Sequence, residues 1–304
     1  MQDKNKAIKS GFEKTADTEV PVIHIRPSKG WVGLNLYEMW QYRDLLYFLT
    51  WRDVKVKYKQ ALLGFAWAIL VPLSTMVVFG TIFGKIAKLS SDGLNPYLFY
   101  MAGLVPWQYF ANSLTMSANS LIGQVNLLTK IYLPRLFIPL SSCIAALVDF
   151  VVSFVILVAM MLCFRIIPAA TSLLLPFLIL IVFAAALGVG LVLSAMNVKY
   201  RDIRYVVPFL VQMWMYCSVL LPFSKIPQNW GNWRYLYGLN PMAGVVEGCR
   251  WCLMHHKMFV DKAMTVPVQP PCLLLAIGVA VTLILLVFGL YYFKRMEKMF
   301  ADIV

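Results

Sequence analysis

The sequence predicts an all-α membrane protein with six transmembrane helices. The chain has 304 residues, of which 61% are hydrophobic and only 13% are charged. Its apolar residues are gathered into six runs, each close to the roughly 20 residues that an α-helix needs to cross about 30 Å of hydrocarbon. Nearly all charged residues fall between these runs, which is typical of an integral membrane protein.

The six runs lack the alternation of polar and apolar residues that marks a membrane β-strand. Helices satisfy their backbone N–H and C=O groups internally, as the bilayer interior requires. Only Asp149 places a formal charge inside any of the runs. The predicted spans are Leu62–Gly84, Tyr97–Ala118, Leu140–Phe164, Leu173–Met196, Tyr205–Phe223 and Cys272–Phe293.

The distribution of Lys and Arg predicts the orientation in the membrane. Six spans place both termini on the same side, and that side holds 19 of the 27 basic residues. Because basic loops are retained in the cytoplasm, we expect both termini to be cytoplasmic. The net charge of +13 is clustered at the membrane edges, which favours contact with anionic lipid headgroups over nucleic-acid binding.

Two segments precede the first span. Residues 1–34 are polar and lack the apolar core of a signal peptide, so they predict a cytoplasmic tail. Residues 35–61 predict an amphipathic helix at the membrane interface and a basic linker, because apolar residues recur there at helical spacing. The apolar stripe comprises Met39, Tyr42, Leu45, Leu46 and Leu49. The basic residues that follow lie where phosphate headgroups would be, and either form a dedicated site there or simply enforce topology: Arg52, Lys55, Lys57 and Lys59.

Two of the connections between spans have their own predicted structure. Segment 126–139 is short, apolar and basic, and Pro134 and Pro139 should separate it from the third span, so we expect a short helix across the cytoplasmic mouth. Segment 224–271 contains a stretch, Asn240–Met254, that is too short to span and too apolar for water. It predicts a re-entrant or interfacial helix on which Glu247 and Arg250, at i and i+3, neutralise each other.

The sequence gives no catalytic site. The nearest approach to a phosphate-binding loop, Gly80–Ile86, is one residue short of the Walker spacing and ends in Ile instead of Ser or Thr. Three histidines and one intramembrane Asp do not make a proton relay. Soft metal ligands occur together at Cys249, Cys252, His255 and His256, but their surroundings also suit an interface helix, so we assign no metal and no cofactor to the chain.

Several motifs, in colinear order over about residues 35–300, resemble the permease subunits of bacterial ABC transporters that export polysaccharides. This family includes the O-antigen, capsule and teichoic-acid exporters. Many members of this family carry a run with two prolines at the end of span five. In this chain the corresponding run, Ser218-Val-Leu-Leu-Pro222, lacks the first of these prolines, which weakens the expectation of a kink there. The matching motifs are Tyr42–Leu46, Trp51–Asp53, Lys57–Trp67 with Pro72, Asn197–Asp202, and Asn240-Pro-Met with Glu247–Trp251.

The resemblance implies a homodimer in the bacterial inner membrane, driven by two copies of a separate cytoplasmic subunit that binds ATP and magnesium. It implies that the substrate is a polysaccharide, O-antigen being favoured, linked through pyrophosphate to a polyprenyl lipid. The segment that docks on the ATPase would comprise Leu127, Leu128, Lys130, Ile131, Tyr132, Leu133, Pro134 and Arg135. The outer gate would include Asn240, Pro241, Glu247, Arg250 and Trp251.

A sugar polymer can slide over aromatic side chains, because sugar rings present apolar C–H faces. Aromatic residues in the predicted spans are therefore candidates for the channel wall. They are Trp67, Phe79, Trp107, Tyr109, Trp214 and Tyr216.

Two other classes of function stay open: an ABC exporter of capsule, teichoic acid or a small molecule, and a membrane glycosyl or acyl transferase. A transferase would need acidic or histidine residues gathered on one face, which the spans do not supply.

Overall fold

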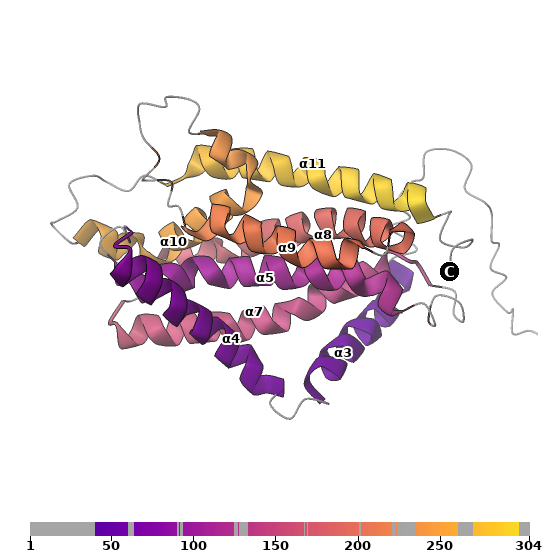
Figure 1. Ribbon diagram of the computed structural model, residues 1–304, viewed down its shortest axis with the longest axis horizontal. Helices are drawn as coiled ribbons and strands as arrows, with labels where there is room; N and C mark the ends of the chain where they lie inside the picture. The colour runs from indigo at the N-terminus through magenta and orange to yellow at the C-terminus, as the bar shows by residue number, and fades with distance from the viewer. Residues whose placement is uncertain are drawn as a thin grey trace, which may run out of the picture. The chain divides into compact units, whose positions relative to one another are not determined.

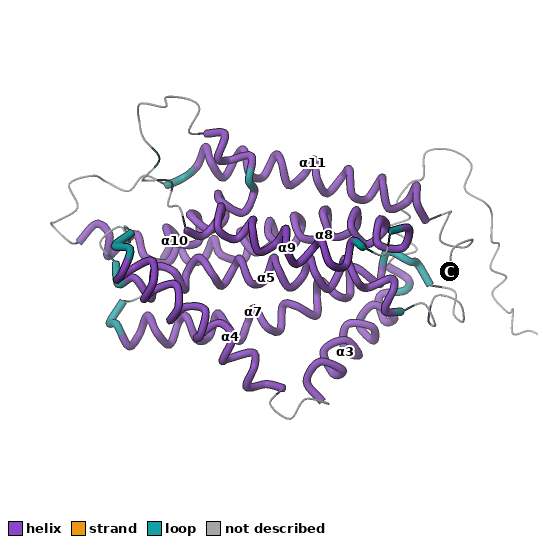
Figure 2. The backbone as a smooth tube through the Cα atoms, in the orientation of Figure 1, coloured by secondary structure: helices purple, strands orange, loops and turns teal. Residues whose placement is uncertain are grey.

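The computed structural model describes residues 40–59, 64–89, 91, 94–124, 127, 133–166, 168, 170–200, 202–220, 223, 226, 235–260 and 270–297. The chain divides into two units, Met1–Asn35 and Leu36–Val304, and all described residues belong to the second. All regular structure in these ranges is helical, as predicted from the sequence (Figure 2). The predicted tail of residues 1–34 lies outside the described ranges.

The first half of the helical unit contains helix α3 (Arg43–Lys59), helix α4 (Gly64–Phe79) and helix α5 (Pro96–Gly123). A π-helix, η1 (Gly80–Ile86), continues α4 without a break. Asn95 caps α5, because its side chain accepts a hydrogen bond from the Tyr97 amide at 3.0 Å, and Pro96 occupies the first helical position. In Figure 1, α3 and α4 are inclined to the long helices of the bundle.

The second half begins with helix α7 (Phe137–Cys163), the 3₁₀ turn η2 (Ala170–Leu174) and helix α8 (Leu175–Lys199). Helix α9 (Ile203–Met215) continues into a second π-helix, η3 (Tyr216–Leu220). Helix α10 (Pro241–Val260) and helix α11 (Cys272–Glu297) complete the unit. The long helices α5, α7, α8 and α11 run side by side, with α3 near one end of the bundle and α10 near the other (Figure 1). We call these the α3 end and the α10 end.

Five predicted spans correspond to helices that are long and apolar enough to cross a bilayer. Their limits differ from the predicted limits by a few residues, which is the usual uncertainty of helix ends. Among the described residues the five candidate spans are Phe65–Ile86, Phe137–Cys163, Ala170–Lys199, Ile203–Leu220 and Cys272–Glu297. The predicted sixth span, Tyr97–Ala118, is helical and lies within α5, but α5 is less apolar than the other five.

The lower hydropathy of α5 follows from its position. At 28 residues it is about 42 Å long, and it packs against α4, α7, α8, α9 and α10. Polar side chains are tolerated because they face neighbouring helices: Ser113, Ser117 and Ser120 are buried. Asn197 of α8 binds the backbone of α5, since its Nδ2 donates to the Ala118 carbonyl at 2.9 Å.

The apolar stripe predicted for the N-terminal helix faces the protein. Leu49 is buried, and Tyr42, Leu45 and Leu46 are half-buried, because α3 packs chiefly on α7. The exposed face of this segment carries the aromatic side chains Trp40, Tyr47, Phe48 and Trp51. The stripe therefore anchors α3 to the bundle, and aromatic residues form the face that is turned away from it.

One prediction about a helix break is corrected. Pro139 does not separate the connection from the third span, because it occupies the first turn of α7, where its missing N–H would have had no partner within the helix. At the run that lacks the expected proline, α9 continues as the π-helix η3 from Tyr216 to Leu220. Carbonyls of η3 bind other segments, since Cys217 accepts from the Tyr237 hydroxyl and Val219 accepts from Arg250 Nη2.

Two apolar clusters form the core. The larger surrounds α5 and includes residues of α7, α8 and α10. The smaller, at the α3 end, unites Leu121 of α5, Leu133 and Leu136 before α7, and Phe293 and Met296 of α11. Helices α8 and α11 approach so closely that a Cβ on Gly289 would lie 2.2 Å from the Gly188 carbonyl oxygen, which explains the glycine there.

Candidate functional site

An open groove of about 740 Å³ lies at the α3 end. Its volume falls in the range of small-molecule binding sites. Helix α3 forms one wall, and the C-terminal end of α5 and the start of α7 form the rest. Its lining comprises Arg52, Asp53, Val56, Lys57, Met116, Asn119, Ser120, Gly123, Gln124, Leu127 and Ser142. Two of the four basic residues predicted to bind phosphate groups, Arg52 and Lys57, therefore reach the same cavity.

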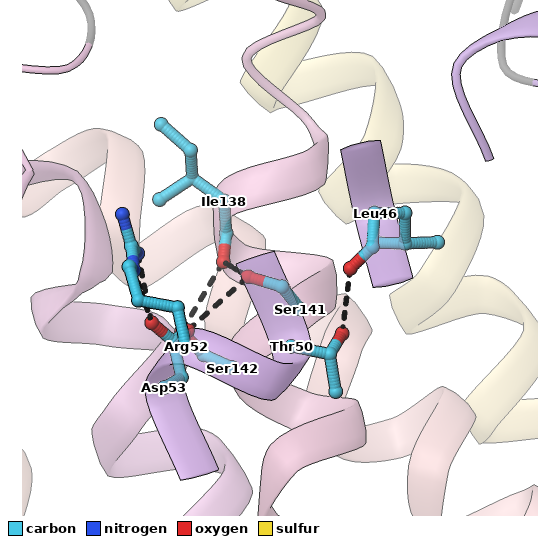
Figure 3. A network of polar contacts seen from close by, with 7 residues as sticks. All are labelled: Leu46, Thr50, Arg52, Asp53, Ile138, Ser141 and Ser142. Atoms are coloured by element: carbon cyan, nitrogen blue, oxygen red, sulfur yellow. Dashed lines mark hydrogen bonds and ion pairs between the residues drawn. The ribbon is translucent and has the colours of Figure 1, made fainter. Parts of the chain in front are cut away.

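Arg52 is held beside the groove by its neighbour on α3. Its Nη2 donates to Asp53 Oδ1 at 2.7 Å, and the other Asp53 oxygen accepts from the Ser141 hydroxyl of α7 at 3.3 Å. Ser141 and Ser142 both lie within hydrogen-bond distance of the Ile138 carbonyl in the first turns of α7 (Figure 3). The arrangement fixes the Arg52 guanidinium near the groove and joins α3 to α7.

Asp149, the lone charge predicted inside a span, has two partners on α3. Its Oδ2 accepts from the Lys57 ammonium, and its Oδ1 accepts from the Tyr58 hydroxyl. Burial raises the pKa of Tyr58 above its ordinary value, and the hydrogen bond to Asp149 raises it further. Tyr58 therefore stays protonated at neutral pH and acts as a donor. A carboxylate in an apolar helix is costly unless it is paired, and these two side chains supply the pairing.

The other two basic residues of the linker differ from this pair. Lys55 and Lys59 are exposed on α3 and do not line the groove. They remain available for lipid headgroups, whereas Lys57 is committed to Asp149 in this conformation. The four residues predicted as one basic site therefore separate into two inside the groove and two outside it.

The predicted ATPase-docking segment is described at its two ends only. Leu127 and Leu133 pack into the apolar cluster at the α3 end, and Pro134 lies three residues before the first residue of α7. Arg135 points to α11, because its Nη1 donates to the Glu297 carbonyl at 2.5 Å. The remaining members, Leu128, Lys130, Ile131 and Tyr132, lie outside the described residues.

The predicted outer-gate residues meet at the α10 end. Arg250 is 2% exposed, and its Nη1 donates to Glu247 Oε1 at 3.1 Å, which confirms the predicted ion pair. Its Nη2 donates to the Val219 carbonyl of η3 at 2.8 Å, and its guanidinium lies 3.9 Å from the centre of the Phe99 ring of α5. Trp251 is half-buried on the same helix. The pair therefore ties α10 to both η3 and α5.

Asn240 makes a second connection at this end. Its Oδ1 accepts from Trp214 Nε1 at 2.8 Å and from the Met242 amide at 3.1 Å, which places it at the start of α10 beside Pro241. Its Nδ2 donates to the Ser218 hydroxyl of η3 at 2.8 Å. The predicted gate residues thus form a polar junction that joins α10 to α9 and η3.

The six candidate channel aromatics lie in different environments. Phe79, Trp107 and Tyr109 are buried, and their rings contact Tyr100, Trp214 and Phe150 of the same chain. They are core residues of this chain, and a place for them on a channel wall stays a prediction. Trp214 is half-buried and bound to Asn240. Trp67 is 55% exposed and Tyr216 is 38% exposed, so the channel prediction is retained for these two.

The cysteine and histidine segment falls on α10. Cys249 and Cys252 are buried, and burial raises the pKa of both thiols, that of Cys252 to about 11, which opposes the thiolate form that metals require. Within the described ranges no group of His, Cys, Asp and Glu side chains is arranged to hold a metal ion. The side chains of His255 and His256 lie outside what the structure describes.

Sequence reasoning missed the partnership of Tyr58 and Lys57 with Asp149, and that of Asp53 with Ser141. One signal could have found the first. A carboxylate inside an apolar span requires a cation or hydrogen-bond donor from another segment, and the basic linker is a source of both. No pattern in the sequence indicates which of its basic residues reaches across.

A bundle of helices able to span a bilayer, with a groove that charged side chains reach at one end and a buried ion pair at the other, defines a multi-pass membrane protein. The profile of the ABC-2 type transporter family matches residues 44–254, and the chain belongs to this family of transport subunits.

Several relatives are similar over most of the chain. The O-antigen export system permease protein RfbA of Myxococcus xanthus is 28% identical over 266 residues, covering 87% of this chain and 97% of the relative. The protein of the same name from Klebsiella pneumoniae is 27% identical over 261 residues, covering 86% and 95%. The polysialic acid transport protein KpsM of Escherichia coli is 25% identical over 211 residues, covering 67% and 78%.

Proposed function

We propose that this chain is the permease subunit of a bacterial polysaccharide exporter, with O-antigen as the favoured substrate. The observation that carries the proposal is its similarity to O-antigen export permeases over nearly their whole length. In this proposal two copies form a channel across the inner membrane with both termini in the cytoplasm, and α5 is the sixth span. A polymer of the polysialic acid type is the second candidate, because of the similarity to KpsM.

The chain would depend on a separate subunit for energy. Membership of the ABC-2 family implies an ATP-binding partner, and the segment between α5 and α7 is our candidate for its docking site. The ends of that segment pack into the cluster that also holds Phe293 of α11 and Leu45 of α3. A displacement of the segment would therefore act on several helices at once, because packed side chains transmit movement with little compression.

The groove is our candidate for the place where the lipid-linked substrate is loaded. A pyrophosphate group carries several negative charges and suits sites with guanidinium and ammonium donors, which Arg52 and Lys57 provide. The exposed Lys55 and Lys59 would attract the same substrate and the anionic membrane surface. Exposed Trp67 and Tyr216 would then offer apolar faces to the sugar chain.

Deletion of the gene in its native host, with measurement of surface and intracellular glycan, tests the proposal. We expect loss of the surface polysaccharide and accumulation of lipid-linked polysaccharide inside the cell, both reversed by the intact gene. The complemented protein, purified in mild detergent, should carry an ATPase subunit. Unchanged surface glycan in the deletion strain, or an active protein without an ATPase, would contradict export and favour the transferase alternative.

A further inference from the structure

The Lys57 and Asp149 side chains differ in their access to solvent. The Lys57 side chain is 42% exposed and lines the groove, whereas the Asp149 side chain is 12% exposed and lies behind it on α7. An anion in the groove can therefore reach the ammonium group directly. The carboxylate already occupies part of the coordination sphere that such an anion would use, because it accepts a hydrogen bond from the same nitrogen.

Helix α3 is attached to α7 by two different kinds of contact. In its N-terminal half, Leu45 packs against the apolar cluster at the α3 end, and Leu49 is buried. In its C-terminal half, no side chain from Thr50 to Lys59 is fully buried, and Asp53, Lys57 and Tyr58 make hydrogen bonds to α7. An anion that competes for the charged groups would therefore loosen the C-terminal half of α3 from α7 and leave its N-terminal half in place.

We infer that the pair formed by Lys57 and Asp149 is a latch that holds the C-terminal half of α3 against α7, and that a phosphate-bearing ligand in the open groove releases this half by replacing Asp149 as the partner of Lys57. The inference rests on the proposed function for the identity of the ligand, but the latch itself follows from the contacts. Asp149 is then a positioning residue, since it acts on the ligand site through Lys57.

The physical basis is a difference in affinity between two states. With the groove empty, separation would leave a poorly hydrated carboxylate without its cation, so the latched state is favoured. A bound phosphate or pyrophosphate group gives Lys57 a charge-assisted partner in its place. The ligand shifts the equilibrium because it binds the released state better than the latched state.

The distance between α3 and α5 across the groove reports the state of the latch. Spin labels can be placed by Val56→Cys and Gly123→Cys, which both line the groove. Val56 is exposed, and a side chain at Gly123 would meet no atom within 4 Å. The exposed Cys163, Cys217 and Cys272 are replaced by serine to prevent labelling elsewhere. The labelled full-length protein is placed in nanodiscs of zwitterionic phosphatidylcholine.

With native Lys57 and Asp149, we expect one short distance that lengthens when inorganic pyrophosphate is added without magnesium. Asp149→Asn should show the long distance before any addition, because a neutral amide does not hold the ammonium group. Lys57→Gln should also show the long distance and should not respond to pyrophosphate. The exchanged pair, Lys57→Asp with Asp149→Lys, restores opposite charges and should return the short distance, which separates loss of the latch from loss of the fold.

A second set of nanodiscs contains anionic phosphatidylglycerol and no pyrophosphate. A long distance there would support the latch and identify lipid phosphate as an occupant. The latch is overturned if the distance is the same in the native pair, Asp149→Asn and Lys57→Gln, or if the native pair responds to neither phosphate source. Lost glycan export in the deletion strain with unchanged distances would leave the proposed function standing without the latch. Responsive distances with unchanged surface glycan would leave the latch standing with a different phosphate-bearing cargo.

Discussion

The Arg250 guanidinium lies 3.9 Å from the centre of the Phe99 ring and donates to Glu247 at 3.1 Å, so one buried cation joins an aromatic face of α5 to a carboxylate of α10. Its third nitrogen, Nε, has no hydrogen-bond partner among the described residues. A buried cation with a single carboxylate and a ring is sensitive to the loss of either partner. This cluster is therefore the place where small changes at the α10 end should have the largest effects.

Removal of one member of the pair should destabilise the protein strongly. Glu247→Gln and Arg250→Met should each lower the free energy of unfolding by about 3–5 kcal/mol, because each leaves a buried charge without its counter-charge. The double variant should lose less than the sum of the two. Denaturant unfolding of the purified protein gives the three values. Strict additivity would show that the two charges do not interact.

Gly103 should tolerate no side chain. A Cβ at this position would lie 2.7 Å from Arg250 Nη2, so Gly103→Ala should displace the guanidinium and destabilise the protein by about 1–3 kcal/mol. Gly123→Ala on the same helix is the matched control, because a Cβ there meets nothing within 4 Å. Thermal unfolding midpoints of the two variants test the contrast, and equal midpoints would refute the steric argument.

Substitution of two tryptophans, Trp107 and Trp67, should affect stability and polysaccharide export differently. Trp107 is buried against Phe110 and Trp214, so Trp107→Ala should cost about 3–5 kcal/mol of stability. Trp67 is exposed, so Trp67→Ala should leave the unfolding midpoint nearly unchanged while lowering the amount of surface polysaccharide. Stability is measured on purified protein and export on intact cells at matched expression. Normal export with Trp67→Ala would remove this residue from the channel.

Arg135 should act through α11. Its hydrogen bond to the Glu297 carbonyl stabilises the end of that helix, so Arg135→Ala should increase amide exchange in the last turns of α11. Lys294→Ala is the control, because it removes an i,i+3 ion pair with Glu297 of the kind worth about 0.3–0.5 kcal/mol and leaves the Arg135 contact intact. Hydrogen-exchange mass spectrometry measures the difference. Equal exchange in the two variants would show that Arg135 does not hold α11.

The sequence predicted the helices well, because length and hydropathy decide whether a segment can cross a bilayer, and both are local properties. It also predicted the pairing of Glu247 with Arg250, which share a helix face. It did not distinguish α5, predicted from Tyr97–Ala118, from the five more apolar helices. Ser113 and Ser117 of α5 can be buried because other helices pack around them, and the sequence of α5 does not show which helices these are.

The sequence by itself therefore determined the class of the protein, the helical segments, and the position of Asp149 as the one charge inside a predicted span. The tertiary structure decided which partner it has, Lys57 and Tyr58 some 90 positions earlier in the chain. It also decided that Trp107 is a core residue while Trp67 is exposed. Burial and long-range pairing depend on how helices pack, and the same apolar composition suits a lipid-facing surface, a channel wall or a helix interface.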